Sequence, residues 1–269
     1  MNYRHIYHAG NWVDVIKHII LIEFLKSLKA KEKPFTILDN FAGCGIYDLN
    51  DEKSQKTSEA TDGIKKFYDY INKNNVGDYK DYIDIIKLFN PNAELLKYPG
   101  SPLIVLKMMR EIDRAIFYEL HPEDFRTLKN HTKYYNNCHI HKSDGFGAHK
   151  ISLPFKTSRG LIFSDPCFEK EDEFDKLIDC FNVQKQRALN ASSLTWYPIK
   201  NAIKTTKFYQ ELRNVKFSDT IILEVERVDF FMNLTKIGFV LINPPMLDLL
   251  KILEPLKNIW NINCILKKI

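Results

Sequence analysis

The sequence lacks the features that would mark a membrane, secreted or repetitive protein. Its 269 residues contain no signal peptide, no long apolar segment, no repeat, no low-complexity tract and no lipidation motif. The five cysteines are an odd number without paired spacing, which argues against a disulfide framework. These absences predict a cytoplasmic protein with reduced thiols and no membrane partner.

The spacing of metal ligands is also missing, although histidine is present. Pairs at tight helical or hairpin spacing, such as His-Glu-x-x-His, would indicate a metal centre, and none occurs. We therefore predict no metal. The histidines that raise the question are His5, His8, His18, His139, His141 and His149.

The charge balance is mildly basic. There are 39 Lys and Arg against 34 Asp and Glu, which gives a formal net charge of +5 and an isoelectric point near 8.7. This balance is compatible with a polyanionic partner, although many lysines only solvate a surface. A hydrophobic content of 45% in a chain of this length predicts a globular fold with a sizeable core.

The first strand-and-loop signal lies near the N-terminus. Residues 35–39 form a predicted buried strand, and residues 40–45 a glycine-containing loop. Asp39 at the strand end, followed by Gly43, is typical of the first nucleotide-binding turn of a Rossmann-like fold, where glycine lets the backbone approach a ligand. The pattern Leu-Asp-x-x-Ala-Gly-x-Gly favours S-adenosylmethionine enzymes, since they need no third glycine for a pyrophosphate.

Three further predicted strands also end at an acid. Glu119, Asp144 and Asp165 follow them, and parallel strands present their carboxyl ends at one edge of a sheet. Together with Asp39, these acids indicate a ligand that crosses this edge. Ser101 is predicted to cap a helix that returns to the same edge. Other strands are expected at 193–198, 220–226 and 237–242. The expected fold is α/β and Rossmann-like, with a seven-stranded mixed sheet.

Residues 50–98 differ from their surroundings. Two polar stretches rich in tyrosine and lysine, 58–73 and 78–89, have few apolar positions and are bounded by turn residues. We interpret them as a small inserted helical subdomain over one edge of the site, which either contacts nucleic acid or is a solubilising cap. The Rossmann-like domain then consists of residues 1–49 and 99–269.

The predicted first helix, residues 11–30, carries an unusual polar set. It is apolar around much of its circumference, yet Asp14, Lys17 and His18 recur on one stripe. Buried polar groups need partners. The stripe, with the aromatic and basic residues 3–9 before it, either lines the site or is a satisfied polar seam.

The segment Ser164–Phe168 resembles the Asp/Asn/Ser-Pro-Pro-aromatic signature of amino-group methyltransferases. An adenine amino group is a poor nucleophile until two acceptors draw its hydrogens out of the ring plane. Asp165 and the carbonyl of Pro166 can be these acceptors, and Phe168 can stack on a base rotated out of its helix. Cys167 replaces the second proline. Taken alone, the segment is equally an Asp-Pro turn after a core strand.

Six ordered motifs, which together span nearly the whole chain, resemble the RlmJ family. They are Tyr-Arg-His-x-x-His-Ala-Gly-Asn-x-x-Asp-Val-x-Lys-His at 3–18, Tyr-Pro-Gly-Ser-Pro at 98–102, Glu-Leu-His-Pro at 119–122, Asp-Gly-Phe at 144–146, Trp-Tyr-Pro at 196–198 and Asn-Pro-Pro at 243–245. The resemblance implies an S-adenosylmethionine-dependent methyltransferase that acts on N6 of one adenine in bacterial 23S rRNA. It also implies a Rossmann-like domain with an inserted helical subdomain.

The residue pattern and the resemblance together assign roles to individual residues. Cofactor contacts are expected at His18, Asp39, Gly43, Ser101, Glu119, Asp144, Gly145 and Asp165. Catalytic roles are expected for Asp165, Pro166 and Phe168. Substrate contacts are expected at Tyr3, Arg4 and Lys17. We expect the protein to act as a monomer.

Two departures from the family pattern keep other interpretations open. Phe41 stands where the family has a cofactor-contacting histidine, and Cys167-Phe168 replaces Pro-Tyr. We expect a working enzyme with altered cofactor affinity. One alternative is a nucleic-acid-binding protein of the same fold that has lost catalysis and acts in the use of external DNA. Another is methylation of DNA adenine or of a protein glutamine, although no target-recognition domain of the usual size is evident.

Overall fold

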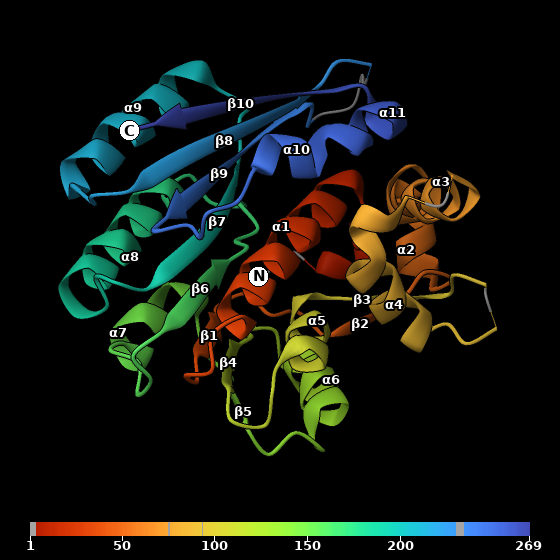
Figure 1. Cartoon of the computed structure of the whole chain (residues 1–269), viewed down its shortest axis with the longest axis horizontal. Coiled ribbons are helices and arrows are strands. Elements are labelled where there is room, and N and C mark those ends of the chain that lie inside the picture. The colour runs from red at the N-terminus through yellow and green to blue at the C-terminus, as the bar shows by residue number, and fades with distance from the viewer. Residues whose placement is uncertain (1–3, 75, 93, 230–233) are drawn as a thin grey trace.

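The computed structural model describes residues 4–74, 76–92, 94–229 and 234–269, and a mixed sheet lies at its centre (Figure 1). Its strands are β1 (Thr36–Asp39), β4 (Arg114–Tyr118), β5 (Cys138–His141), β6 (Gly160–Ser164), β7 (Ser192–Pro198), β8 (Thr220–Arg227), β9 (Lys236–Ile242) and β10 (Ile262–Lys268). The spatial order is β10-β8-β9-β7-β6-β1-β4-β5. The five strands from β7 to β5 run parallel, whereas β9 pairs antiparallel with both β7 and β8. This confirms the α/β, Rossmann-like architecture.

The expected number of seven strands was one too low for this sheet, because β10 adds an eighth strand in the described part of the chain. It pairs antiparallel with β8 along its whole length, from Ile262 opposite Arg227 to Lys268 opposite Ile221. Only Ile262 of this strand is buried. An edge strand that is exposed along most of its length lacks the buried apolar run by which the other strands are recognised.

A small second sheet lies at the base of the segment 50–98. Its two strands, β2 (Ile46–Asp48) and β3 (Lys97–Pro99), pair antiparallel, with Tyr47 opposite Tyr98. The pairing brings the two ends of the segment together beside α5 (Ser101–Met108). The chain therefore leaves the nucleotide-binding loop and returns to it at nearly the same place.

Helices cover both faces of the main sheet. The remaining helices are α1 (Trp12–Lys29), α2 (Glu52–Thr57), α3 (Lys66–Asn74), α4 (Lys80–Leu88), α6 (Pro122–Thr132), α7 (Ala148–Ser152), α8 (Glu173–Arg187), α9 (Ala202–Val215), α10 (Leu249–Leu253) and α11 (Lys257–Trp260). Helical turns also occur at His5–Tyr7, Thr61–Lys65, Gly77–Tyr79, Gly145–Gly147 and Glu254–Leu256. Buried side chains of α1 and α5 share a core with Ile37 of β1, whereas α7 packs with the next residue, Leu38. Successive residues of β1 thus point to opposite faces of the sheet and pack against different helices.

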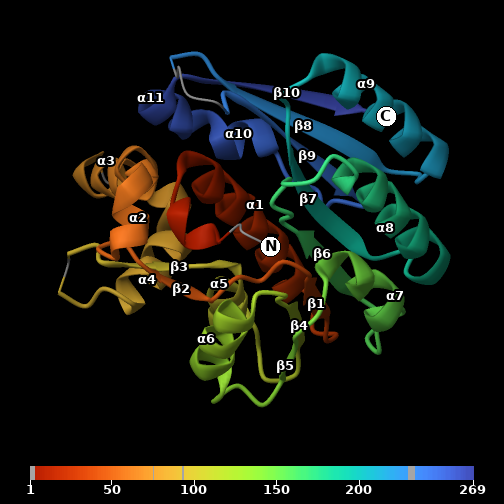
Figure 2. The same ribbon diagram turned by 180° about the vertical axis from the view of Figure 1, so that it is seen from behind.

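Helix α1 is buried on nearly every side. The Asn11 side chain accepts a hydrogen bond from the amide of Asp14 at 2.9 Å and caps the helix. On one side α1 contacts α5 and the sheet core, and on another it contacts α4 and the turn Thr61–Lys65. Figures 1 and 2 show α1 between the sheet and the helices α2, α3 and α4. This position explains why its polar residues are buried.

The segment 50–98 shares its buried side chains with the main core. Phe67, Ile71, Tyr82 and Ile86 project from α3 and α4 into the same cluster as the apolar residues of α1. Tyr79 also donates a hydrogen bond to the carbonyl of Ile252, at 2.7 Å. The division into a domain of residues 1–49 and 99–269 and an inserted subdomain of residues 50–98 stays a prediction.

The cap of α5 differs from the expectation. Gly100, and not Ser101, is the N-cap residue, and Ser101 is the first residue of the helix. The Ser101 hydroxyl donates to Oδ2 of Asp39 at 2.7 Å instead of accepting a bond from the helix. Leaving a buried carboxylate without a donor costs more free energy than leaving a helix end uncapped. The Ser101 hydroxyl therefore donates to Asp39 and does not cap the helix.

Three features of composition have structural counterparts. All five cysteines are free thiols. Within the described residues, no helix is long and apolar enough to cross a membrane. The same part of the chain contains no group of three or more His, Cys, Asp or Glu side chains that could hold a metal ion.

Candidate functional site

The carboxyl ends of β1, β4, β5 and β6 meet around a cavity of about 260 Å³. Seven of the eight residues predicted to contact the cofactor line it, namely His18, Gly43, Ser101, Glu119, Asp144, Gly145 and Asp165. The eighth, Asp39, lies behind Ser101 as its hydrogen-bond acceptor. Residues from distant parts of the sequence therefore converge at the predicted edge of the sheet.

Glu119 follows β4 and is held by the backbone on both oxygens. Its Oε2 accepts from the amide of Gly43 at 2.8 Å, and its Oε1 accepts from the amide of His121 at 2.6 Å. Gly43 has φ +66°, and a Cβ there would lie 2.1 Å from the Tyr47 hydroxyl, so only glycine fits. Burial raises the pKa of Glu119 above its ordinary value. The loop and the carboxylate thus form one rigid unit.

Asp39 is a fully buried acid next to this unit. Burial raises its pKa to about 7, although the Ser101 hydroxyl and the amide of Phe41 stabilise the charged form. Asp39 ends β1, so its position follows directly from the strand. It links the nucleotide-binding loop to the start of α5.

Asp144 and Gly145 follow β5 at the rim of the cavity. Oδ1 of Asp144 accepts from the amide of Phe146 at 3.1 Å and caps a short helical turn. A Cβ on Gly145 would lie 1.9 Å from the carbonyl oxygen of Asn40. The side chain of Asn40 donates to the carbonyl of Gly145 at 3.3 Å, which fastens the two loops together.

His18 is a neutral buried histidine at the inner wall. Its Nδ1 lies 2.8 Å from the Tyr98 hydroxyl and 3.4 Å from the Tyr82 hydroxyl. Burial lowers its pKa to about 3. Because the imidazole stays uncharged at neutral pH, His18 offers a ligand a hydrogen bond without a charge.

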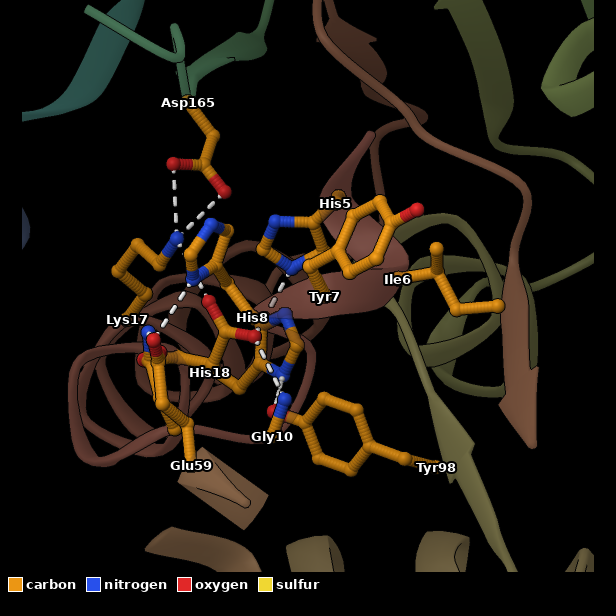
Figure 3. Close-up of polar contacts among 12 residues, drawn as sticks. His5, Ile6, Tyr7, His8, Gly10, Lys17, His18, Glu59, Tyr98 and Asp165 are labelled. Carbon is orange, nitrogen blue, oxygen red and sulfur yellow. Dashed lines mark hydrogen bonds and ion pairs between the residues drawn. The ribbon is translucent and has the colours of Figure 1, made fainter. Parts of the chain in front are cut away.

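Lys17 lies between two carboxylates deep in the site. Its Nζ is 2.6 and 2.8 Å from the two oxygens of Asp165 and 2.8 Å from Oδ1 of Asp14 (Figure 3). Lys17 is 3% exposed, and its ammonium group lies 5.1 Å from the centre of the Trp196 ring. Burial raises the pKa of Asp165, and the Lys17 charge acts in the opposite direction. The polar stripe of α1 therefore reaches the segment Ser164–Phe168.

His5 extends this cluster towards the opening of the cavity. Its Nε2 lies 2.9 Å from Oδ2 of Asp14, which also accepts from the amide of Gly10 at 2.8 Å. Burial opposes charge on both groups, but His5 and Lys17 together hold the pKa of Asp14 well below its ordinary value. The leader before α1 thus contributes directly to the site.

The sequence predicts that Phe168 stacks on a base in the site, but in the structure its ring packs against other aromatic side chains. The Pro166 carbonyl accepts from the indole N–H of Trp196 at 3.0 Å. Phe168 has φ +52°, and its ring packs against Phe174 and Trp196, with centroids 4.9 and 5.6 Å apart. Phe168 lines a neighbouring hollow of about 220 Å³ and not the main cavity. The roles predicted for Pro166 and Phe168 stay predictions.

The predicted substrate residues have different surroundings. Arg4 is half-buried and forms ion pairs with Glu123 at 2.7 Å and Asp124 at 2.8 Å. Lys17 belongs to the buried cluster just described, and Tyr3 lies outside the described residues. Contacts of Arg4 and Lys17 with a substrate stay predictions.

Of the residues that depart from the family pattern, Phe41 and Cys167 lie in the wall of the cavity, whereas Phe168 lines the neighbouring hollow. Phe41 packs edge-on against Phe146, with ring centroids 5.0 Å apart. The Sγ of Cys167 lies 3.9 Å from Oε1 of Glu173. The cavity is present with both residues in its lining.

Several residues of the site were not selected from the sequence. His5 belongs to the leader that the sequence predicts either to line the site or to form a polar seam, but the sequence assigns no individual role to His5, Asn40, Trp196 or Glu173. Asn40 could have been found from its place directly after Asp39. Trp196 lies in the Trp-Tyr-Pro motif, yet neither Trp196 nor Glu173 carries a local signal for its contacts, because both reach the site through pairing and packing of distant segments.

Comparison with known proteins decides the family. Residues 32–258 match a family model described as "Ribosomal RNA large subunit methyltransferase D, RlmJ". The chain belongs to the RlmJ family. The curated relatives include "Ribosomal RNA large subunit methyltransferase J" of Haemophilus influenzae, 35% identical over 91% of this chain and 88% of the relative. The Escherichia coli protein of the same name is 33% identical, with the same shares covered.

A solved structure agrees with this assignment. A crystal structure of a Legionella pneumophila protein is 30% identical, has a TM-score of 0.89, and covers 97% of this chain and 98% of its own. RlmJ membership confirms the predicted Rossmann-like methyltransferase fold and the predicted class of enzyme, an rRNA methyltransferase. The roles of individual residues are not decided by it.

Proposed function

We propose that this protein transfers a methyl group from S-adenosylmethionine to N6 of an adenine in 23S rRNA. One observation carries the proposal, namely the position of Asp165 in the wall of a cavity that Glu119 and Asp144 also line. The family supplies the class of reaction and of substrate, since its relatives are named rRNA large subunit methyltransferases. N6 as the acceptor follows from the chemistry of the Asp165 segment.

The cavity suits S-adenosylmethionine in its donor set and in its shape. Glu119 is an acceptor for ribose hydroxyls at the end of the second parallel strand, where Rossmann-like folds place such an acid. Gly43 and Gly145 let the backbone come close to a ligand. His18 and Ser101 add hydrogen-bonding groups at the inner wall. When bound, the cofactor supplies an electrophilic methyl group on a sulfonium.

The target adenine, which accepts the methyl group, meets Asp165 and the residues around it. Asp165 accepts a hydrogen bond from the amino group and stabilises the positive charge that develops on nitrogen during transfer. The Pro166 carbonyl has a second lone pair besides the one that Trp196 uses, so it remains able to accept. Lys17 holds Asp165 in the ionised, acceptor form and fixes its direction. Positioning of the two reactants supplies most of the remaining rate.

The test is methyl transfer itself. Purified protein is incubated with S-adenosylmethionine carrying a labelled methyl group and with protein-free 23S rRNA from a strain that lacks this gene. We expect label in N6-methyladenine after digestion of the RNA. Label in another nucleoside, or in DNA with none in rRNA, would overturn the proposal. The expected monomeric state and cytoplasmic location stay predictions.

A further inference from the structure

Glu173, at the start of α8, is a buried carboxylate in the cavity wall without a described role. It is 5% exposed, and its Oε2 has no hydrogen-bond partner among the described residues. The other oxygen, Oε1, lies 3.9 Å from the Cys167 thiol, which is a weak donor. The backbone amide of Lys170 also stabilises the charged carboxylate. One strong acceptor is therefore left for a group inside the cavity.

Such an arrangement is costly unless a ligand completes it. A buried acceptor without a donor loses its hydration and gains nothing in return. Burial raises the pKa of Glu173, which agrees with incomplete solvation of the charge. Acceptors of this kind in a native protein call for a partner, and the cavity is the side from which one can come.

The surroundings of Glu173 indicate which end of the cavity it serves. Helix α8 lies against the turn Gly145–Gly147, since the Cys180 thiol donates to the carbonyl of Phe146 at 3.4 Å. The Lys176 ammonium lies 5.4 Å from the centre of the Phe146 ring. Asp144, whose Oδ1 caps this turn, lies at the rim of the same cavity. The carboxylates of Glu173 and Asp144 thus both lie in the cavity wall near this turn.

We propose that Glu173 accepts a hydrogen bond from the exocyclic amino group of an adenine bound in the cavity. The inference rests on the proposed function, which brings two adenines to the site, one in the cofactor and one in the target RNA. In that proposal Asp165 and the Pro166 carbonyl accept the two amino hydrogens of the target adenine, so Glu173 is assigned to the cofactor adenine. An adenine amino group has two hydrogens and no charge, so it matches a buried acceptor with an unused oxygen. The ring face would meet Phe41 and Phe146, which line the same cavity.

Binding of S-adenosylhomocysteine and of S-inosylhomocysteine tests the proposal. The second compound carries a carbonyl oxygen where the first carries the amino group. Calorimetry on the wild-type protein should show a preference for S-adenosylhomocysteine of about tenfold. Glu173→Gln should lose most of this preference, because its amide can donate to the carbonyl. Glu171→Gln is the matched control, since the Glu171 side chain is 95% exposed two residues away.

A second arm separates the two adenines. If the preference is unchanged in Glu173→Gln but the KM for RNA rises about tenfold, Glu173 contacts the target RNA and not the cofactor adenine, and the inference is overturned. Unchanged preference and unchanged KM in a folded variant would overturn the inference. Thermal unfolding checks the fold, and Glu173→Ala replaces Glu173→Gln if that variant does not fold. Wild-type protein that binds neither compound would instead contradict the proposed function.

Discussion

The two halves of the site are built in different ways. In the strand-end half, Asp39 and Glu119 are held by hydroxyl and backbone donors, and burial raises the pKa of both. In the helix half, Asp14 and Asp165 are held by the ammonium of Lys17. The first half consists of acids that follow strands directly, whereas the second depends on an ion pair between residues 148 positions apart in the sequence.

This difference matches two chemical tasks. An acceptor for neutral hydroxyl or amino groups needs fixed geometry more than charge, and backbone donors provide it. An acceptor for an amine that becomes positive must be ionised when the reaction starts, and a buried lysine keeps it so. Substitutions in the helix half should therefore lower mainly the rate of methyl transfer, whereas substitutions in the strand-end half should weaken mainly ligand binding.

Loss of Asp165 should have the largest effect. Asp165→Ala removes the acceptor at which charge develops, so the single-turnover rate of methyl transfer should fall roughly 10²- to 10³-fold. Binding of S-adenosylhomocysteine should weaken much less, because the strand-end half is intact. Equal losses in rate and in binding would remove the distinction between the halves.

Loss of Lys17 should reduce stability most. Lys17→Met leaves Asp14 and Asp165 as buried carboxylates without their cation, and the free energy of unfolding should fall by about 3–5 kcal/mol. Lys26→Met is the control, since the pair of Lys26 with Glu23 is exposed and such pairs contribute about 0–1 kcal/mol. Urea unfolding that gives the same value for both variants would contradict the account.

Asp39 of the strand-end half and His18 of α1 should respond to pH in opposite directions. Because the pKa of Asp39 is raised to about 7, the folded protein binds more protons than the unfolded chain between about pH 4 and 7, and stability falls as pH rises. Because the pKa of His18 is lowered to about 3, the unfolded chain binds more protons between about pH 3 and 6.5, and stability rises with pH.

Single variants separate these opposing slopes. Relative to Asp39→Asn, the wild-type protein should lose stability on the order of 3 kcal/mol between pH 4 and 7. Relative to His18→Asn, it should gain stability over pH 3 to 6.5. Denaturant unfolding at several pH values gives both differences, and parallel curves for wild type and Asp39→Asn would show that Asp39 is ionised throughout.

The smallest effect is expected at the ribose position. Glu119→Gln keeps the shape but weakens the acceptor, so the Kd of S-adenosylhomocysteine should rise about tenfold. Glu111→Gln, an exposed change, should leave it unaltered. Calorimetry measures both. A Kd that is unchanged in Glu119→Gln would place the ribose away from β4.

The sequence predicted the strand-end half well and the helix half only in part. Asp39, Glu119 and Asp144 follow strands whose apolar runs are local signals, so their common edge could be inferred. Asp165 of the helix half also follows a strand and could be placed at the same edge. The Asp165–Lys17 pair could not, because it depends on how α1 packs against the sheet.

The edge strand β10, the role of Ser101 and the burial of Glu173 were also hard to predict, because they depend on contacts between distant segments. The strand β10 has almost no buried residues, and Ser101 gave up its expected role as a cap because Asp39 lies within reach. Glutamate is usually exposed, so nothing local indicates that Glu173 is buried in the folded chain. Local patterns reveal elements, whereas partners of polar groups follow from the assembled fold.

A crystal structure with S-adenosylhomocysteine would test the central claim most directly. The account predicts that the ligand lies along the ends of β1, β4 and β5, with its ribose at Glu119 and its sulfur facing Asp165. It also predicts that the Lys17–Asp165 pair is retained beside it. A ligand bound in the hollow beside Phe168 and Pro198, or one whose sulfur lies away from Asp165, would contradict the account.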